Sequence, residues 1–369
     1  MEEITAEDRG AYLHFLERVI AHRGVTAAFA EAAVRHRRME ADFNGRLLSN
    51  CPAATAPRFP HMELAPAQYW QRNFFSILFL SIFDAIGIPP ERQHRYGMLL
   101  HAVRGIVTAT DNILDDEAKG SVQLALQGGK VLPNVLVMLM ESGVFTEVLA
   151  ELCSSREAVA KTWKGLLNAL FALGTEESAE EHAIEDVLDP KRLLDEIHRF
   201  RGGGLLLLAF VAPECNEPQL REKIRLAKAG VNHIGLSLQI LDDLTDFEED
   251  LRKRNHNMLR SWVVHYQVDG PCTDAHLKEL APEVLKAPEV HFKTATAQVM
   301  QVAIEMALAG FALLHQVGHP SDRAAAVELI ATMFRLRGLE RLWSVYEHSQ
   351  RITPSPASAV DYAQYFPRD

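Results

Sequence analysis

The chain has 369 residues, 48% of them hydrophobic and 24% charged, which is typical of a globular protein that can bury a sizeable core. Its formal net charge of -11 argues against nucleic acid as a main partner, because phosphate binding needs clustered Lys and Arg. The acidic residues are therefore candidates for metal binding or for solubility.

Cysteine usage and apolar windows indicate the cellular setting. The four cysteines are scattered without a CxxC pair, which favours reduced thiols over a disulfide framework or a zinc site. The most apolar windows, 74–88 and 205–211, are too short to span a bilayer. The chain does not open with a basic-then-apolar signal pattern. We therefore expect a cytoplasmic protein with no transmembrane segment.

Helical periodicity runs through most of the chain. Residues 6–50 predict two amphipathic helices, and the Pro- and Ala-rich stretch 52–66 predicts a linker. No alternating strand pattern and no repeat of fixed period is present. The sequence predicts an all-α protein with three parts: an N-terminal helical extension and linker (1–64), an α-helical domain (65–350) and an extended C-terminal tail (351–369).

An acidic cluster follows a strongly apolar run in the second half of the chain. The run from Ile234 to Leu241 leads directly into six acids within the nine residues 242–250. No proline or glycine interrupts 238–250, so we interpret this stretch as part of one long helix that extends over 218–254. On a helix, Asp242, Asp246 and Glu249 share one stripe. A single cluster of this kind is most simply a solvated helix end.

A second cluster of the same design lies upstream. The segment Thr110-Asp111-Asn112-Ile113-Leu114-Asp115-Asp116-Glu117 also ends an apolar helix, with Asp111 and Asp115 four residues apart. Two helices that each carry a carboxylate pair can face each other across a bundle. Such carboxylates suit Mg²⁺, which prefers a few carboxylates together with water and substrate phosphate oxygens.

The two clusters resemble the aspartate-rich motifs of class I isoprenoid synthases, specifically of trans-polyprenyl diphosphate synthases. That family carries DDxxD on one helix and GxxxQxxDDxxD on another. The first motif is DNxxD here, with Asn112 in place of the middle Asp. The second is complete in Gly235, Gln239, Asp242, Asp243 and Asp246. The resemblance covers about residues 65–350, and it implies a helical bundle around a central apolar cavity, a homodimer, and a prenyl diphosphate as substrate.

The resemblance also implies a chemistry and a set of site residues. Three Mg²⁺ ions with bound diphosphate would neutralise the diphosphate that leaves an allylic substrate, by electrostatic stabilisation and Lewis-acid catalysis. The implied metal ligands are Asp111, Asp115, Asp242 and Asp246. Arg201 stands where the family has a diphosphate-binding Lys-Thr pair, and Gln239 would hydrogen-bond near the allylic carbon. The remaining substrate contacts would be Lys253 and Arg254 at the diphosphate, and Ile106 and Val107 where the family limits product length.

Two departures remove positive charge meant for a second diphosphate. The family binds isopentenyl diphosphate through a Gly-Lys-x-x-Arg segment, and this chain keeps only Arg72 within residues 69–74. The Arg-Arg-Gly that follows the family's first motif is replaced by residues 118–120, Ala-Lys-Gly.

The reaction therefore stays open at the level of sequence. A polyprenyl-synthase-like prenyltransferase, which forms a carbon–carbon bond, is the first hypothesis. Asp242, Thr245 and Glu249 also fit the (N/D)xx(S/T)xxxE metal triad of class I terpene cyclases, which use a single prenyl diphosphate. A third alternative, favoured by Asn112 and the missing basic residues, is a catalytically silent helical subunit.

Overall fold

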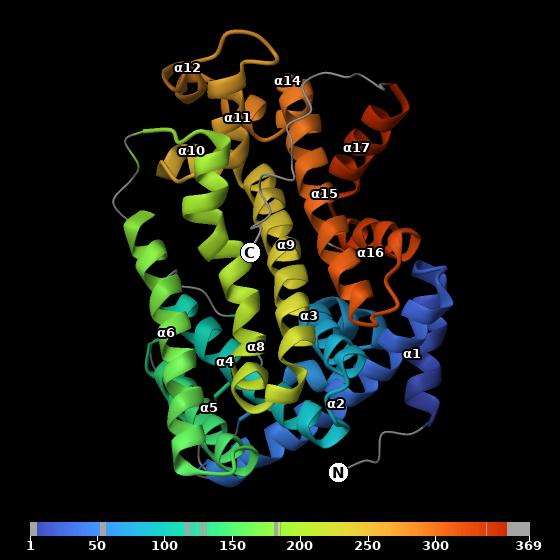
Figure 1. Cartoon of the computed structure of the whole chain (residues 1–369). Coiled ribbons are helices and arrows are strands. Elements are labelled where there is room, and N and C mark those ends of the chain that lie inside the picture. Colours follow the sequence, from blue (N-terminus) through green and yellow to red (C-terminus); the bar gives the residue numbers. More distant parts are fainter. Residues whose placement is uncertain are drawn as a thin grey trace. The chain divides into compact units, whose positions relative to one another are not determined.

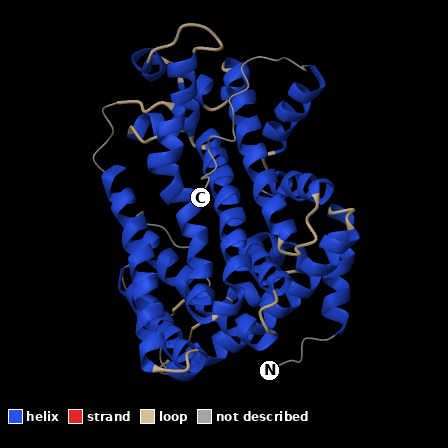
Figure 2. Cartoon of the chain, in the orientation of Figure 1, coloured by secondary structure: helices blue, strands red, loops and turns tan. Residues whose placement is uncertain are grey.

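The computed structural model describes residues 6–51, 57–114, 119–120, 122–124, 126, 129, 131–180, 184, 186–336 and 338–352. Helices connected by loops make up this part of the chain (Figures 1 and 2). Extended segments pair in it only at one antiparallel bridge, between Arg58 and Gln123. The all-α prediction is confirmed.

The helices follow one another closely along the chain. In order they are α1 (Ala6–Val19), α2 (Arg23–Asn50), η2 (Pro60–Glu63), α3 (Pro66–Ile86), α4 (Pro90–Leu114), α5 (Val131–Leu152), α6 (Arg156–Glu180), α7 (Pro190–Arg192), η3 (Leu193–Gly204), α8 (Leu205–Asn216), η4 (Pro218–Leu220), α9 (Arg221–Thr245), α10 (Phe247–Lys253), α11 (Met258–Tyr266), α12 (Asp274–Glu279), α13 (Pro282–Leu285), α14 (Pro288–His291), α15 (Lys293–Gln316), α16 (Arg323–Leu336) and α17 (Glu340–Ile352). The short helices η2 and η4 are of the 3₁₀ type, and η3 is a π-helix.

The contacts divide the chain into two compact units. Unit 1 consists of Met1–Leu166, Ala209–Ala227 and His315–Ser321. Unit 2 consists of Leu167–Leu208, Lys228–Leu314 and Asp322–Asp369. The first acidic motif therefore belongs to unit 1 and the second to unit 2. The boundaries predicted from sequence, at 64/65 and 350/351, stay predictions.

The core of unit 1 joins the N-terminal helices to α3. Phe29 of α2 packs edge-on against Trp70 of α3, with ring centroids 6.0 Å apart, and stacks on Phe74 at 5.9 Å. Phe29 and Trp70 are completely buried. Burying aromatic rings of this size contributes some of the largest apolar stabilisation in a fold. The two helices expected at 6–50 thus exist as α1 and α2, and α2 shares its core with α3.

In unit 2, α9 and α15 approach each other at paired glycines. A Cβ atom on Gly230 would lie 2.7 Å from the Gly310 carbonyl oxygen, and one on Gly310 would lie 2.5 Å from the Gly230 carbonyl oxygen. Only glycine permits this contact between backbones. By length and composition, α15 is the one described helix that could cross a membrane, yet 61% of its most apolar window is buried inside the protein. Such burial is expected of a core helix.

The prediction of one uninterrupted helix over 218–254 is wrong. Helix α9 ends at Thr245, Asp246 has non-helical backbone angles (φ -99°, ψ 13°), and α10 begins at Phe247. The Thr245 hydroxyl donates a hydrogen bond to the Asp242 carbonyl oxygen at 2.8 Å, and the same carbonyl also accepts from the Asp246 N–H at 2.8 Å. Three acids in the first turn of α10 favour a new N-terminus here, since they complement the helix dipole.

Candidate functional site

The π-helix η3 and α9 meet at a glycine contact inside unit 2. A Cβ atom on Gly202 would lie 2.5 Å from the Gly235 carbonyl oxygen and 2.6 Å from Cβ of Gln239. A Cβ on Gly235 would in turn overlap the Gly202 carbonyl oxygen. The glycine of the second motif therefore has a structural purpose, since it admits the backbone of η3 one turn before Gln239. The contact also fixes the turn that carries Arg201.

The paired aspartates of the second motif have different environments. Asp243 is buried, with 2% of its surface exposed, and contacts three partners. Its carboxylate accepts hydrogen bonds from Nε2 of Gln239 at 3.1 Å and from the backbone N–H of Met258 at 2.5 Å, and it lies 2.8 Å from Nε2 of His198. Asp243 thereby connects α9 to η3 and to the start of α11. Asp242 is half-buried, and Asp246 is exposed.

A third carboxylate, Asp250, completes this acidic region. It accepts hydrogen bonds from the side-chain amides of Asn257, at 2.9 Å, and Asn255, at 3.2 Å. Burial, with additional repulsion from Asp243 and Asp246, raises the pKa of Asp250 to about 7. Burial also raises the pKa of Asp246, helped by the charges of Glu249 and Asp243. The carboxylates of Asp243, Asp246 and Asp250 are therefore close enough to repel one another.

The basic residues predicted around the second motif lie in the same unit. Arg201 is half-buried on η3, and its charge contributes to lowering the pKa of His256, which burial above all holds at about 4. Lys253 forms an ion pair with Glu249 at 2.6 Å. Arg254 ends α10 in the left-handed conformation, with φ of 60°. Its side chain is exposed.

The two residues of the alternative cyclase triad already have partners. Besides its bond to the Asp242 carbonyl, Thr245 donates to Oδ1 of Asp246 at 3.3 Å. The ion pair with Lys253 lowers the pKa of Glu249. Both side chains are exposed, so a bound cation could replace these contacts at little cost.

The first motif ends helix α4 in unit 1. Asp111 is exposed in the last turn, whereas Asp115 lies outside the described residues. Asn112 is buried, and its side-chain amide donates to the Lys119 carbonyl and accepts from the Lys119 N–H at 2.8 Å. The amide also donates to Oδ1 of Asn134 at 3.1 Å. Sequence reasoning treated Asn112 as a lost metal ligand and missed this anchoring role.

The substrate contacts predicted for unit 1 have clear positions. Ile106 and Val107 are half-buried on α4, one turn before Asp111. Arg72 on α3 is exposed and donates to the Gly120 carbonyl oxygen at 3.4 Å. Within the described part of the chain, no three His, Cys, Asp or Glu side chains gather closely enough to hold a metal ion by themselves.

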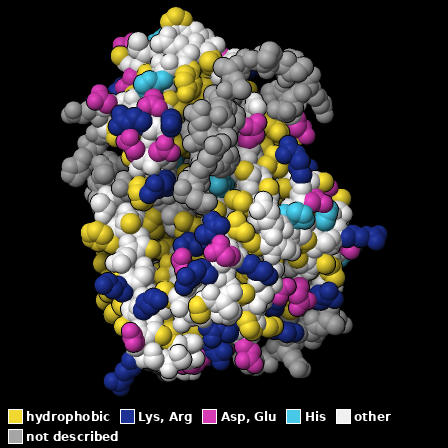
Figure 3. Space-filling model, viewed as in Figure 1, with side chains coloured by type: hydrophobic (Ala, Val, Ile, Leu, Met, Phe, Trp, Pro, Cys, Tyr) yellow, Lys and Arg dark blue, Asp and Glu magenta, His cyan; other side chains and the backbone are white. Residues whose placement is uncertain are grey.

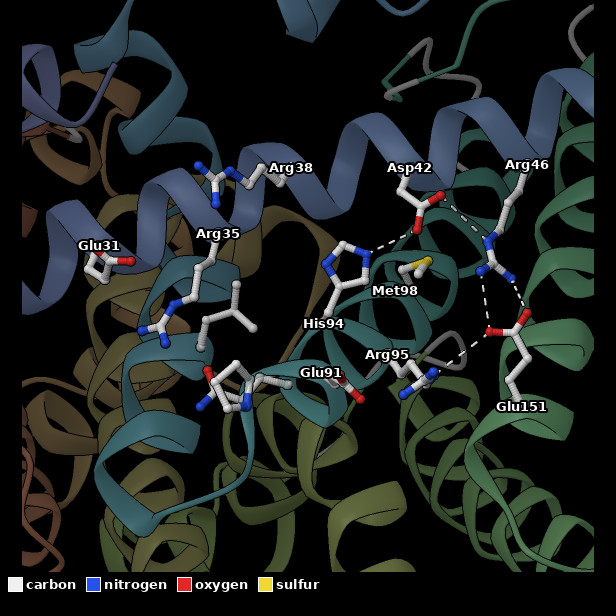
Figure 4. A pocket seen from close by; sticks show the side chains of 13 residues that line it. Glu31, Arg35, Arg38, Asp42, Arg46, Glu91, His94, Arg95, Met98 and Glu151 are labelled. Carbon is white, nitrogen blue, oxygen red and sulfur yellow. Dashed lines mark hydrogen bonds and ion pairs between the residues drawn. The ribbon is translucent and has the colours of Figure 1, made fainter. Parts of the chain in front are cut away.

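A separate polar groove of about 530 Å³ lies between α2 and α4 of unit 1 (Figure 4). It contains none of the predicted site residues, and many of its charges pair with each other. Arg46 contacts Glu151 at 2.7 Å, and His94 contacts Asp42 at 3.0 Å. On the face shown in Figure 3, acidic and basic side chains are likewise intermixed.

Comparisons with known proteins identify the fold. No protein-family model and no curated protein matches the chain. Among solved structures, the geranylgeranyl pyrophosphate synthase from Lactobacillus brevis matches with a TM-score of 0.54 and 14% identity, over 89% of this chain and 99% of that one. The geranylgeranyl pyrophosphate synthetase from Pyrococcus horikoshii matches with a TM-score of 0.52 and 14% identity, over 83% of this chain and 98% of that one. The chain has an isoprenoid synthase fold. The predicted resemblance to trans-polyprenyl diphosphate synthases is confirmed for the fold.

Proposed function

We propose that the protein is a Mg²⁺-dependent isoprenoid synthase that ionises an allylic prenyl diphosphate and forms a carbon–carbon bond, as a prenyltransferase. The observation that supports this most is the complete second motif. Gly235 lies against η3, Gln239 and Asp243 hold the surrounding helices, and Asp242 and Asp246 remain toward the surface. The motif is therefore more than an acidic helix end.

Each predicted residue has a role in this proposal. Asp111 and Asp115 of the first motif, and Asp242 and Asp246 of the second, would supply carboxylates to Mg²⁺, and bound Mg²⁺ would supply charge neutralisation for the diphosphate. Arg201, Lys253 and Arg254 add positive charge at the same diphosphate. Gln239 would hydrogen-bond near the allylic carbon of the substrate, and its amide donates to Asp243. Ile106 and Val107 offer apolar surface to the prenyl chain, and Arg72 offers a cation to a second diphosphate.

A terpene cyclase that uses one diphosphate is the alternative favoured by a specific observation. Thr245 and Glu249 are both exposed, and each could exchange its present partner for a cation. A catalytically silent subunit is the remaining alternative.

One experiment separates the three. The full chain is incubated with Mg²⁺ and geranyl, farnesyl or geranylgeranyl diphosphate, with and without isopentenyl diphosphate, and inorganic diphosphate and products are measured. A longer product whose formation requires isopentenyl diphosphate supports the prenyltransferase. A hydrocarbon or alcohol formed without it supports the cyclase and contradicts the prenyltransferase. No turnover with any substrate supports the silent subunit.

Two variants control this assay. Asp242→Ala should abolish turnover, together with any rise in melting temperature that Mg²⁺ and inorganic diphosphate cause. Glu222→Ala removes an acid from the same helix at an exposed position paired with Arg225, and it should leave both measurements unchanged.

We further propose that the protein is a cytoplasmic homodimer, with α5 at the interface. Helix α5 is strongly apolar, and Val131, Leu132 and Leu139 are more than half exposed on it. A second copy of the chain would cover these side chains. Light scattering should give twice the 41.3 kDa chain mass for the wild type and a smaller particle for Leu139→Glu.

A further inference from the structure

Helix α3 is kinked at Asn73 within unit 1. Asn73 has φ of -106° and ψ of 17°, which are not helical values. A sharp irregularity in a helix needs a local cause, and neither proline nor glycine is present at this turn. The irregularity falls next to Arg72, the one basic residue retained from the family's second-diphosphate segment.

The guanidinium of Arg104 on α4 contacts both sides of this kink. Its Nη1 donates to Oδ1 of Asn73 at 2.9 Å, and its Nη2 donates to the backbone carbonyl oxygen of Arg72 at 3.2 Å. The planar guanidinium of Arg104, whose N–H donors have a fixed geometry, therefore holds both the backbone at Arg72 and the side chain of Asn73. Lysine, with a single ammonium group, could not reproduce this geometry.

Two other helices place buried carboxyl groups near Arg104. Burial lowers the pKa of Arg104, while the carboxyl groups of Glu40 on α2 and Glu141 on α5 raise it. Both glutamates are 1% exposed. Glu40 accepts a hydrogen bond from the Tyr69 hydroxyl at 2.7 Å, and Nδ1 of His36 lies 2.7 Å from the same hydroxyl. The N-terminal helix α2 thus supports the cation that holds α3.

On the other side of the kink, Arg72 reaches the loop that follows the first motif. Its Nη2 donates to the Gly120 carbonyl oxygen, and the neighbouring Lys119 is held by Asn112. The loop is therefore connected to α3 by Arg72 and to α4 by Asn112. Burial lowers the pKa of Arg72, and the charge of Arg104 lowers it further, so the two guanidinium groups are close enough to repel each other. An anion bound at Arg72 would relieve this repulsion.

We propose that Arg104 is a positioning residue for the acceptor substrate: it locks the kink at Asn73 so that Arg72 stays beside Lys119 and Gly120 to hold a second isoprenoid diphosphate. This inference rests on the proposed prenyltransferase function. It also gives the N-terminal helix α2 a part in the reaction, since Glu40 helps to hold Arg104.

Steady-state kinetics of the full chain test the proposal. Asn73→Leu removes the acceptor for Nη1 of Arg104. Arg104→Lys keeps the positive charge but loses the paired guanidinium donors. Each should raise KM for isopentenyl diphosphate by about tenfold or more, while KM for the allylic diphosphate changes by less than about twofold. Asn73→Asp keeps an oxygen acceptor for the guanidinium and should remain close to the wild type.

Arg92→Lys is the matched control. Arg92 lies on the same helix and pairs with Glu217, away from the kink, so both KM values should stay unchanged. Equal rises in both KM values for Asn73→Leu and Arg104→Lys would overturn the proposal, because they would indicate general loosening. Unchanged KM values in both variants would overturn it as well.

Amide hydrogen exchange keeps this test independent of the reaction. If the wild type shows no turnover, the proposed function fails. The contact between Arg104 and Asn73 still predicts faster amide exchange of residues 70–76 and 119–120 in Asn73→Leu than in the wild type. Arg92→Lys should exchange these amides at the wild-type rate. Equal exchange in Asn73→Leu and the wild type would overturn the positioning role of Arg104.

Discussion

The side chain of Asn112 holds the backbone of Lys119 from both directions. Its amide nitrogen donates to the Lys119 carbonyl oxygen, and its amide oxygen accepts from the Lys119 N–H. An aspartate at this position could accept but not donate. The residue that departs from the family's DDxxD pattern is therefore the one that closes the loop behind the motif.

Asn112→Asp restores the family pattern but should destabilise the protein. The new carboxylate would face the Lys119 carbonyl oxygen and Oδ1 of Asn134, and both of these atoms are acceptors. The free energy of unfolding in urea should fall by about 1–3 kcal/mol, the cost of a buried polar group that loses its partner. Asn168→Asp, at an exposed position of α6, should leave it unchanged. A more stable Asn112→Asp protein would contradict the anchoring role.

Alanine at either glycine of the η3–α9 contact should be costly. The added methyl group of Gly202→Ala or Gly235→Ala would have to displace a backbone carbonyl, and overpacking of this kind costs about 1–3 kcal/mol. Because the contact fixes the turn that carries Arg201, the affinity for inorganic diphosphate should fall as well. Gly143→Ala is the control, since no atom lies within 4 Å of a Cβ at that position. Unchanged diphosphate affinity in both variants would show that the glycine contact does not position Arg201 for diphosphate binding.

His319 should make the protein less stable in mild acid. It is buried between Ser81 and Ser321, and burial lowers its pKa from 6.5 to about 4. Because the unfolded chain takes up the proton first as the pH falls, this contribution to stability is present above about pH 6.5 and is lost progressively toward pH 4.

The measurement is urea unfolding as a function of pH. A shift of this size corresponds to about 3 kcal/mol over the full window. His319→Asn should flatten the pH dependence between pH 6.5 and 4, whereas His14→Asn at an exposed position should not. An unchanged slope in His319→Asn would assign the acid sensitivity to other groups.

Glu141 should have the opposite effect on the pH dependence of stability: it should make the protein less stable as the pH rises. Burial raises the pKa of its carboxyl well above 4.5, and neither carboxyl oxygen has a hydrogen-bond partner among the described residues. The folded state therefore keeps a proton that the unfolded chain has lost. Its contribution to stability is full below about pH 4.5 and is lost as the pH rises toward the native pKa.

Replacing the carboxyl group by an amide removes this titration. Glu141→Gln should raise the free energy of unfolding near neutral pH relative to the wild type, and it should reduce the loss of stability that accompanies rising pH. Glu147→Gln, on the same helix but about half exposed, should behave like the wild type. Identical pH profiles for Glu141→Gln and the wild type would show that Glu141 is ionised in the folded protein.

Periodicity and motif spacing predicted the fold class and the resemblance, because both depend on residues read along one helix. They could not show which of Asp242 and Asp243 is buried. Adjacent residues on a helix face different directions, and only the packing of η3 and α11 shows that Asp243 is the buried one. The break at Asp246 was missed for a similar reason. The stretch contains no proline or glycine that would signal a change of backbone angles at Asp246.

The role of Arg104 was also beyond the sequence. The kink that it contacts has no sequence signature, and its partners come from three other helices. Asn112 could have been recognised as a structural residue only if the path of the chain at Lys119 had been known. Conversely, the roles predicted for Asp111, Asp115 and Arg201 rest on motif position, and the enzyme assay decides them.

The packing of Phe29 on Trp70 has a practical consequence. A polypeptide that starts at residue 65 would leave Trp70 and Phe74 without their aromatic partner and Tyr69 without His36 and Glu40. Such a fragment should aggregate on expression, although it contains both aspartate-rich motifs. The shortest piece suitable for purification therefore begins before α2.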